Sequence, residues 1–247
     1  MGRRPMSPSY RLAVGIVRPV LTMVTTRDWQ GAQHLPRSGG YVVCSNHISH
    51  LDPLTGGHFL YDNGALPRFL GKEVLFRLPV VGSILRGAGQ IPVWRESGDA
   101  SRAFSAAVDA VRAGECVVIY PEGTLTRDPG LWPMRGKTGA ARVALTTGCP
   151  VIPVAQWGPQ KILAPYGRRP HLVPRTRVRV HAGPPVELNR FAGKPMDATV
   201  LRQATDAILD DIASMLADIR GQTPPTVRWD PRTHGQAVTG NPKGKGR

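Results

Sequence analysis

Short apolar runs separated by turns dominate the pattern of hydrophobic and polar positions from residue 41 onwards. Each run has the length of a buried strand. The runs cover residues 41–44, 67–70, 89–95, 116–120 and 151–156. Residues 99–112 and 137–147 have the apolar spacing of helices. Strands that alternate with helices predict an α/β fold with a mixed, mostly parallel sheet flanked by helices.

The C-terminal third continues this pattern. Residues 178–181 alternate in the manner of an edge strand. Residues 197–219 have the spacing of a long amphipathic helix, with Asp197 as its N-cap and Gly221 at its end. Beyond Gly221 the chain is rich in Pro, Gly and Thr and ends in alternating basic residues, so we expect a basic disordered tail over residues 221–247.

An amphipathic helix is predicted near the start of the chain, where apolar residues recur at intervals of three and four. They are Tyr10, Val14, Val17, Leu21 and Val24. Arg11 and Arg18 give the other side a positive charge, and Pro19 would bend the helix. This helix either packs on the domain core or lies on an anionic membrane surface. We therefore expect an amphipathic interfacial segment at residues 1–28 and one domain at residues 29–220.

The charge balance predicts an anionic partner. The chain has 32 Lys and Arg against 17 Asp and Glu, a formal net charge of +15. A phosphate-bearing ligand, an anionic membrane surface or a nucleic acid would satisfy it, and charge alone does not choose between them. No nucleic acid is expected, because no recognised binding module or aromatic ladder accompanies the basic residues.

The three cysteines bear on the compartment. Cys44, Cys116 and Cys149 adjoin apolar runs, and no pair has the spacing of a metal site or a redox motif. We expect buried thiols in a reducing compartment, with no metal and no cofactor. The sequence contains no convincing secretory signal and no stretch long and apolar enough to span a bilayer. The expected location is the cytoplasmic face of the cell membrane, with peripheral or monotopic attachment.

The strongest candidate for chemistry is the polar turn that follows residues 41–44. His47 and Asp52 are five residues apart, which suits a turn that enters a helix and returns a carboxylate to the imidazole. Such a carboxylate would accept a hydrogen bond from Nδ1 and leave Nε2 free to take a proton from a hydroxyl. The pair alone is weak evidence, because this spacing arises often by chance.

Two further strand ends offer polar groups. One ends at Arg95, and the other ends in Glu122, Gly123 and Thr124. Ligands of open α/β sheets gather at the carboxyl ends of the strands, so these turns could converge on the turn that carries His47.

Four segments in this order resemble the conserved blocks of the glycerolipid acyltransferases, the bacterial lysophosphatidic acid acyltransferase family. Asn46-His47-Ile48-Ser49-His50-Leu51-Asp52 resembles the first block, with Asn-His followed by four residues and Asp. Residues 89–95, 120–124 and 151–154 resemble the second, third and fourth blocks. The resemblance covers roughly residues 40 to 160.

The resemblance implies transfer of an acyl group from a thioester, on acyl-CoA or acyl carrier protein, to a hydroxyl of a lysophospholipid. The implied general base is His47, oriented by Asp52. A thioester carries an activated carbonyl, so no Ser or Cys nucleophile is needed, and both substrates are bound together.

The blocks also imply a set of substrate-binding residues. Arg95 is expected to contact the phosphate. Glu122 would bind the glycerol hydroxyl or position Arg95, while Gly123 and Thr124 would donate hydrogen bonds to an anion. The full set is Asn46, Arg95, Glu122, Gly123, Thr124, Arg127, Lys137 and Pro153.

Some members of this set have an alternative interpretation. Lys137 lies just before a predicted helix and could equally be a solvated residue. Pro153 belongs either to the acyl-donor site or simply to the edge of a strand. Leu125 follows Thr124 where the family often has Arg, so Arg127 would take over that contact, and Trp94 stands at a position that is commonly polar.

The sequence thus predicts a membrane-associated O-acyltransferase that converts 1-acylglycerol-3-phosphate into phosphatidic acid. Two alternatives stay open. The acceptor could be glycerol 3-phosphate or another lysophospholipid, or the chain could be a non-catalytic lipid-binding protein.

Overall fold

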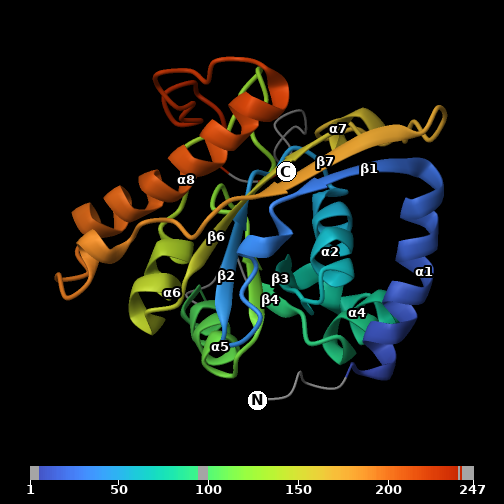
Figure 1. The fold of residues 1–247 in the computed structure, drawn as a ribbon, viewed down its shortest axis with the longest axis horizontal. Coiled ribbons are helices and arrows are strands. Elements are labelled where there is room, and N and C mark those ends of the chain that lie inside the picture. The colour runs from blue at the N-terminus through green and yellow to red at the C-terminus, as the bar shows by residue number, and fades with distance from the viewer. Residues whose placement is uncertain (1–5, 94–99, 239, 241–247) are drawn as a thin grey trace.

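A computed structural model describes residues 6–93, 100–238 and 240, and a seven-stranded sheet runs through this part of the chain (Figure 1). The strand order is β1-β7-β6-β2-β5-β3-β4. Neighbouring strands are parallel except β6 and β7, which are antiparallel. The strands are β1 (Thr25–Gln30), β2 (Tyr41–Ser45), β3 (Arg68–Lys72), β4 (Ile91–Val93), β5 (Cys116–Ile119), β6 (Val151–Trp157) and β7 (Thr176–Ala182).

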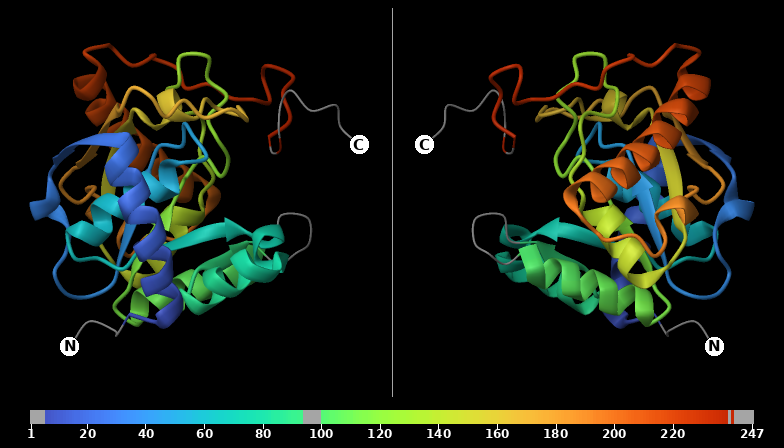
Figure 2. Two further views of the ribbon diagram at one scale, coloured as in Figure 1. Left: turned by 90° about the vertical axis from the view of Figure 1, so that its right-hand side faces the viewer. Right: turned by 90° about the vertical axis from the view of Figure 1, so that its left-hand side faces the viewer.

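Helices cover both faces of the sheet, which confirms the predicted α/β fold. They are α1 (Pro8–Val24), α2 (Asp52–Asp62), α3 (Glu73–Arg77), α4 (Pro79–Gly87), α5 (Ala100–Arg112), α6 (Gly139–Thr147), α7 (Pro159–Ile162) and α8 (Ala198–Arg220). Asp99, which would precede α5, lies outside the described residues. Figure 2 shows α1 and α8 on opposite sides of the molecule, each facing the viewer in one of the two panels.

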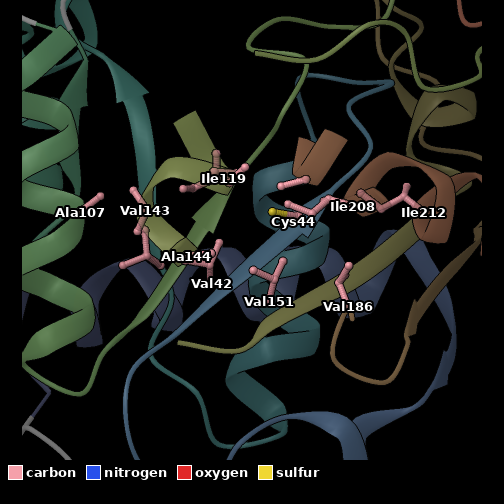
Figure 3. Close-up of a cluster of buried hydrophobic side chains, with 14 of the residues drawn as sticks. Val42, Cys44, Ala107, Ile119, Val143, Ala144, Val151, Val186, Ile208 and Ile212 are labelled. Atoms are coloured by element: carbon pink, nitrogen blue, oxygen red, sulfur yellow. The ribbon is translucent and has the colours of Figure 1, made fainter. Parts of the chain in front are cut away.

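The alternation of side chains along β2 explains why both faces are apolar. Val42 and Cys44 point into a core formed with α5, α6 and α8, which Figure 3 shows with Ile208 and Ile212 of α8. Tyr41 and Val43 point the other way, into a second core beneath α2. Because successive residues of a strand face opposite sides, an uninterrupted apolar run is the signature of a strand covered on both faces.

One strand prediction is wrong. Residues 178–181 were expected at an edge, but β7 lies between β1 and β6. The edge is formed by β1, which has the sequence Thr-Thr-Arg-Asp-Trp-Gln and pairs with β7 from Thr25 to Gln30. This segment has no apolar run and was not recognisable as a strand by its pattern. The alternation of β7 instead buries Val178 and Val180 and turns Arg179 toward the end of α8, where it donates to the Ile219 carbonyl.

The predicted N-terminal helix is present as α1, and its apolar residues divide into two sets. Tyr10, Val14 and Val17 face the domain, and Leu21 is only 5% exposed. A second set, which we call the α1 stripe, is open to solvent: Leu12, Ile16, Val20 and Met23, between 50% and 70% exposed. Among the described helices, none combines the length and apolar composition needed to cross a bilayer.

Hydrogen bonds to α4 and α2 help to attach α1 to the domain. The Ser7 hydroxyl, which caps the helix, also donates to the Gly87 carbonyl at the end of α4, at 2.7 Å. Arg18 donates through Nε to Asp62 at the end of α2, at 2.8 Å. The helix is thereby fixed to the domain with its stripe facing outward.

The chain beyond α8 returns to the domain. The Arg135 amide donates to the Trp229 carbonyl at 2.9 Å, and Arg228 bonds to Asp206 of α8 at 3.4 Å. The sequence predicts a disordered tail over residues 221–247 and gives no sign of these contacts. Residues 241–247, the most basic part of that tail, lie outside the described residues.

Candidate active site

The turn between β2 and α2 brings His47 and Asp52 into contact. Asp52 is the first residue of α2 and is fully buried. Its Oδ2 lies 2.9 Å from Nδ1 of His47 and also accepts the backbone N–H groups of Ile48 and Ser49, at 2.6 and 2.8 Å. One carboxylate oxygen therefore fixes both the imidazole and the turn that carries it, as the five-residue spacing predicted.

His47 itself is accessible from a cavity. Its side chain is 16% exposed, and its ring stacks on Tyr120 at a centroid distance of 4.2 Å with 21° between the planes. The sequence interpretation did not assign Tyr120 a role. With Asp52 at Nδ1 and an aromatic face behind the ring, the nitrogen that remains for a substrate is Nε2.

Glu122 holds the backbone of this turn. It is 1% exposed, and its two carboxyl oxygens accept the backbone N–H groups of His47 and Met134, each at 3.0 Å. Burial raises the pKa of Glu122 to about 8, against the lowering effect of these hydrogen bonds. From this position Glu122 supports the turn and does not line the cavity formed by the described residues, so its expected contact with a glycerol hydroxyl or with Arg95 stays a prediction.

Asn46 joins two strands. Its amide donates to the Gln156 carbonyl at 3.0 Å and accepts the Gln156 N–H at 2.8 Å, and it is 1% exposed. The side chain thus links the end of β2 to β6. It was expected to bind substrate, but its hydrogen-bonding groups face the sheet.

A cavity of about 580 Å³ opens beside His47 and is mostly apolar. The helices α1, α2, α3 and α4 form its walls. Its apolar lining includes Tyr10, Val14, Val17, Pro53, Leu54, Phe69, Leu75, Phe76, Val81, Ile84 and Leu85. The volume and lining are typical of sites for apolar ligands.

Two polar residues of the cavity lie near His47 and were not predicted as binding residues. His50 is in the same turn, and Lys72 is at the end of β3. Burial, and next the proximity of His47 and Lys72, lower the pKa of His50. A lowered pKa keeps His50 neutral near pH 7, so among the described residues of this part of the cavity the positive charge comes from Lys72.

The turn that follows β5 carries the later residues of the third block, Gly123 and Thr124, which do not line the cavity formed by the described residues. Gly123 adopts a φ of 70°, and a Cβ there would come within 3.0 Å of the Lys137 side chain, so glycine allows Lys137 to lie against this turn. Thr124 is 7% exposed. Neither Gly123, Thr124 nor Lys137 lines the cavity formed by the described residues.

Two other predicted residues, Arg127 and Pro153, do not line the described cavity. Arg127 is 6% exposed and donates to the Gly240 carbonyl at 3.0 Å. Pro153 lies inside the sheet rather than at its edge, because β6 is flanked by β2 and β7, and its ring lies close to where a Cβ of Gly183 would be. Arg95 lies outside the described residues.

The sequence profile of the Acyltransferase family matches residues 27–157, which is more than half of the chain. The chain is a member of the Acyltransferase family. The match includes His47, Asp52 and Glu122, the three residues that form the hydrogen-bonded group described above.

Curated relatives of this acyltransferase family member include 1-acyl-sn-glycerol-3-phosphate acyltransferases of Brassica napus and Borreliella burgdorferi. The chloroplastic protein of Brassica napus is 34% identical over 138 residues, which are 55% of this chain and 38% of the relative. The protein of Borreliella burgdorferi is 34% identical over 127 residues, 50% of this chain and 48% of the relative. The matches thus cover less than half the length of each relative.

A solved structure shares the fold of this acyltransferase family member. The crystal structure of the 1-acyl-sn-glycerophosphate acyltransferase PlsC from Thermotoga maritima matches with a TM-score of 0.62 and 20% identity. The match covers 85% of this chain and 82% of that one. The arrangement of strands and helices is therefore one already seen in a solved acyltransferase structure.

The raised pKa of Glu122 predicts a pH dependence of stability. The folded protein holds a proton on this group up to about pH 8, whereas the unfolded chain releases it near the ordinary value of 4.5. The stabilising contribution is full below pH 4.5 and is lost as the pH rises toward 8, at up to about 1.4 kcal/mol per pH unit. Comparing urea unfolding of the wild type and Glu122→Gln from pH 5 to 8 isolates this slope. If the free energy of unfolding changes with pH in the same way in both proteins, the predicted contribution of Glu122 is wrong.

Proposed function

We propose that this protein transfers an acyl group from an acyl thioester to the free hydroxyl of 1-acylglycerol-3-phosphate and so forms phosphatidic acid. The observation that carries the proposal is the contact of His47 with buried Asp52 at the polar end of an apolar cavity. Family membership and the names of the two relatives support it.

The chemistry follows from the geometry around His47. An alcohol is a poor nucleophile at neutral pH, and Nε2 takes its proton as the oxygen attacks the thioester carbonyl. The new O–C bond forms, the C–S bond breaks, and the proton passes from the imidazolium to the leaving sulfur. A base placed in this way contributes on the order of 10²- to 10⁴-fold in rate.

Asp52 and Glu122 prepare this step. The Asp52 carboxylate stabilises the imidazolium that forms and keeps the proton on Nδ1 of the neutral ring. Glu122 accepts the backbone N–H of His47 and so fixes the position of that residue. Because these contacts exist before substrate binds, little reorganisation is needed during the reaction.

The cavity fits the two ends of a lipid. Its apolar walls suit an acyl chain, while Lys72 and His50 lie on the same side as His47 and suit a phosphate and a glycerol hydroxyl. Arg95 stays a further candidate for the phosphate. Acyl-CoA or acyl carrier protein is the proposed donor, and no metal or cofactor is part of the proposal.

The α1 stripe is proposed to lie on the cytoplasmic face of an anionic membrane. The segment that comprises α3, Leu78 and α4, of which α4 packs against α1, adds exposed apolar residues to this surface: Val74, Leu75, Leu78, Val80 and Val81. Since α1, α3 and α4 also wall the cavity, a lipid could pass between bilayer and site without crossing water. The net charge of +15 favours an anionic surface.

The reaction is tested by thiol release and product analysis. Wild-type protein mixed with acyl-CoA should release free thiol only when 1-acylglycerol-3-phosphate is present, and mass spectrometry should find phosphatidic acid. His47→Ala should lower the rate on the order of 10²- to 10⁴-fold because the base is lost. His34→Ala, which removes a histidine outside the cavity, serves as the control.

Full activity of His47→Ala would rule out the mechanism. Turnover with glycerol 3-phosphate in place of the lysolipid would show that the proposed acceptor is wrong and would leave His47 as the proposed base. Binding of lysolipid without thiol release, with either acyl-CoA or acyl carrier protein, would instead identify a non-catalytic lipid-binding protein.

Membrane attachment through the α1 stripe has its own test. Ile16→Ser/Val20→Ser should weaken binding to anionic vesicles on the order of tenfold, because two apolar side chains no longer leave water. Co-sedimentation with phosphatidylglycerol-containing vesicles measures this effect. The control variant Met196→Ser/Val227→Ser removes one exposed apolar residue before α8 and one after it, 48% and 80% exposed, and should bind like the wild type. Equal losses in both variants would argue against the assigned surface.

A further inference from the structure

The connection between α7 and β7 combines exposed apolar and basic residues. We call residues 168–175 the α7–β7 loop. Leu172 is 47% exposed and Val173 is 89% exposed, the largest value among the exposed large hydrophobic residues of the described chain. Arg168 and Arg169 precede them, and Arg175 follows; all three are exposed. Neither the cavity nor the hydrogen bonds of the active site use these side chains.

The loop is joined to the end of α1. The guanidinium of Arg175 donates through Nη2 to the carbonyls of Thr22 and Thr25, at 2.8 and 2.7 Å. Met23, the last residue of the α1 stripe, lies in the same turn of α1 and is 70% exposed. Figure 1 shows the loop projecting beyond the sheet on the side where α1 stands. The loop therefore lies next to the α1 stripe.

The charges around the loop indicate what it contacts. Within the described residues, neither Arg168 nor Arg169 forms an ion pair with an acidic side chain. Two exposed guanidinium groups that have no acidic partner among the described residues, beside an exposed Leu-Val pair, match the interface of an anionic bilayer, where lipid phosphates lie just outside the acyl chains. An apolar protein surface would satisfy Leu172 and Val173 but would leave these charges without partners.

We propose that the α7–β7 loop is a second lipid-contacting element, which inserts Leu172 and Val173 into an anionic membrane while Arg168 and Arg169 bind lipid phosphates. The inference rests on the membrane contact of the α1 stripe in the proposed function. It adds a second attachment at the C-terminal end of α1. Contacts along α1 and at the loop beyond its C-terminal end together restrict the rotation of the domain on the bilayer, and so the direction in which the cavity faces.

Vesicle co-sedimentation of the full chain tests the apolar and the basic residues separately. Leu172→Ser/Val173→Ser should weaken binding to vesicles of phosphatidylcholine and phosphatidylglycerol on the order of tenfold. Arg168→Ser/Arg169→Ser should weaken binding to the same vesicles about 10- to 30-fold at low salt. The same substitution should change binding to vesicles of phosphatidylcholine alone very little, because these carry no net charge. Arg190→Ser/Arg232→Ser removes the same charge from exposed sites elsewhere and should have a clearly smaller effect.

Insertion itself is measured with a fluorescent side chain. The emission of Val173→Trp, taken as the difference from wild type, should shift to shorter wavelength when anionic vesicles are added, and brominated lipids should quench it. An unshifted, unquenched emission would overturn the proposal, as would wild-type binding by both loop variants. If instead Leu172→Ser/Val173→Ser dissociates a dimer in sedimentation velocity and leaves vesicle binding unchanged, the partner is a second copy of this chain and the proposal is wrong.

These results are separable from the proposed function. Vesicle binding does not depend on turnover, so an inactive wild type would refute acyl transfer and leave the loop measurable. If Ile16→Ser/Val20→Ser binds vesicles like the wild type while the loop variants do not, the membrane contact assigned to the α1 stripe is wrong and the one assigned to the α7–β7 loop is supported.

Discussion

The site depends on one buried carboxylate. Oδ2 of Asp52 accepts the backbone N–H groups of Ile48 and Ser49 and contacts Nδ1 of His47. A buried charge is costly unless it is hydrogen-bonded, so the turn and the imidazole both have to be in place for the fold to be stable. These three contacts at Oδ2 offset part of the cost of burying Asp52, whose Oδ1 has no partner among the described residues, and they leave only Nε2 of His47 for a substrate.

The sheet extends this constraint into a site. Asn46 fixes the end of β2 to β6, and Glu122, which follows β5, holds the His47 backbone, so the strands on both sides of β2 position one residue. The apolar helices α1 to α4 then surround the cavity into which His47 is exposed. A rigid polar turn next to an apolar space suits a substrate with a polar head and a long chain. The exposed stripe of α1 and the adjacent loop orient that space toward lipid in our account.

Local features of this arrangement could be predicted from the sequence, and long-range ones could not. The strand at residues 41–44 and the His47–Asp52 pair depend on neighbouring residues, whose spacing the sequence displays. Glu122 and Gln156 bond to residues 75 and 110 positions away, and such contacts depend on strand order and register. For that reason Glu122 and Asn46 were expected at the substrate. Lys72 and His50 were not assigned roles, because only the folded chain brings them to one cavity, and β1 has no apolar run to reveal it.

The tautomer of His47 tests the central claim most directly. Nitrogen-15 NMR of the imidazole, assigned by comparison with His47→Gln and recorded where the ring is neutral, distinguishes a protonated from an unprotonated ring nitrogen. The account predicts a proton on Nδ1, donated to Asp52, and none on Nε2. A proton on Nε2, with Nδ1 unprotonated, would contradict it, because the nitrogen facing the cavity could not then accept a proton from a hydroxyl.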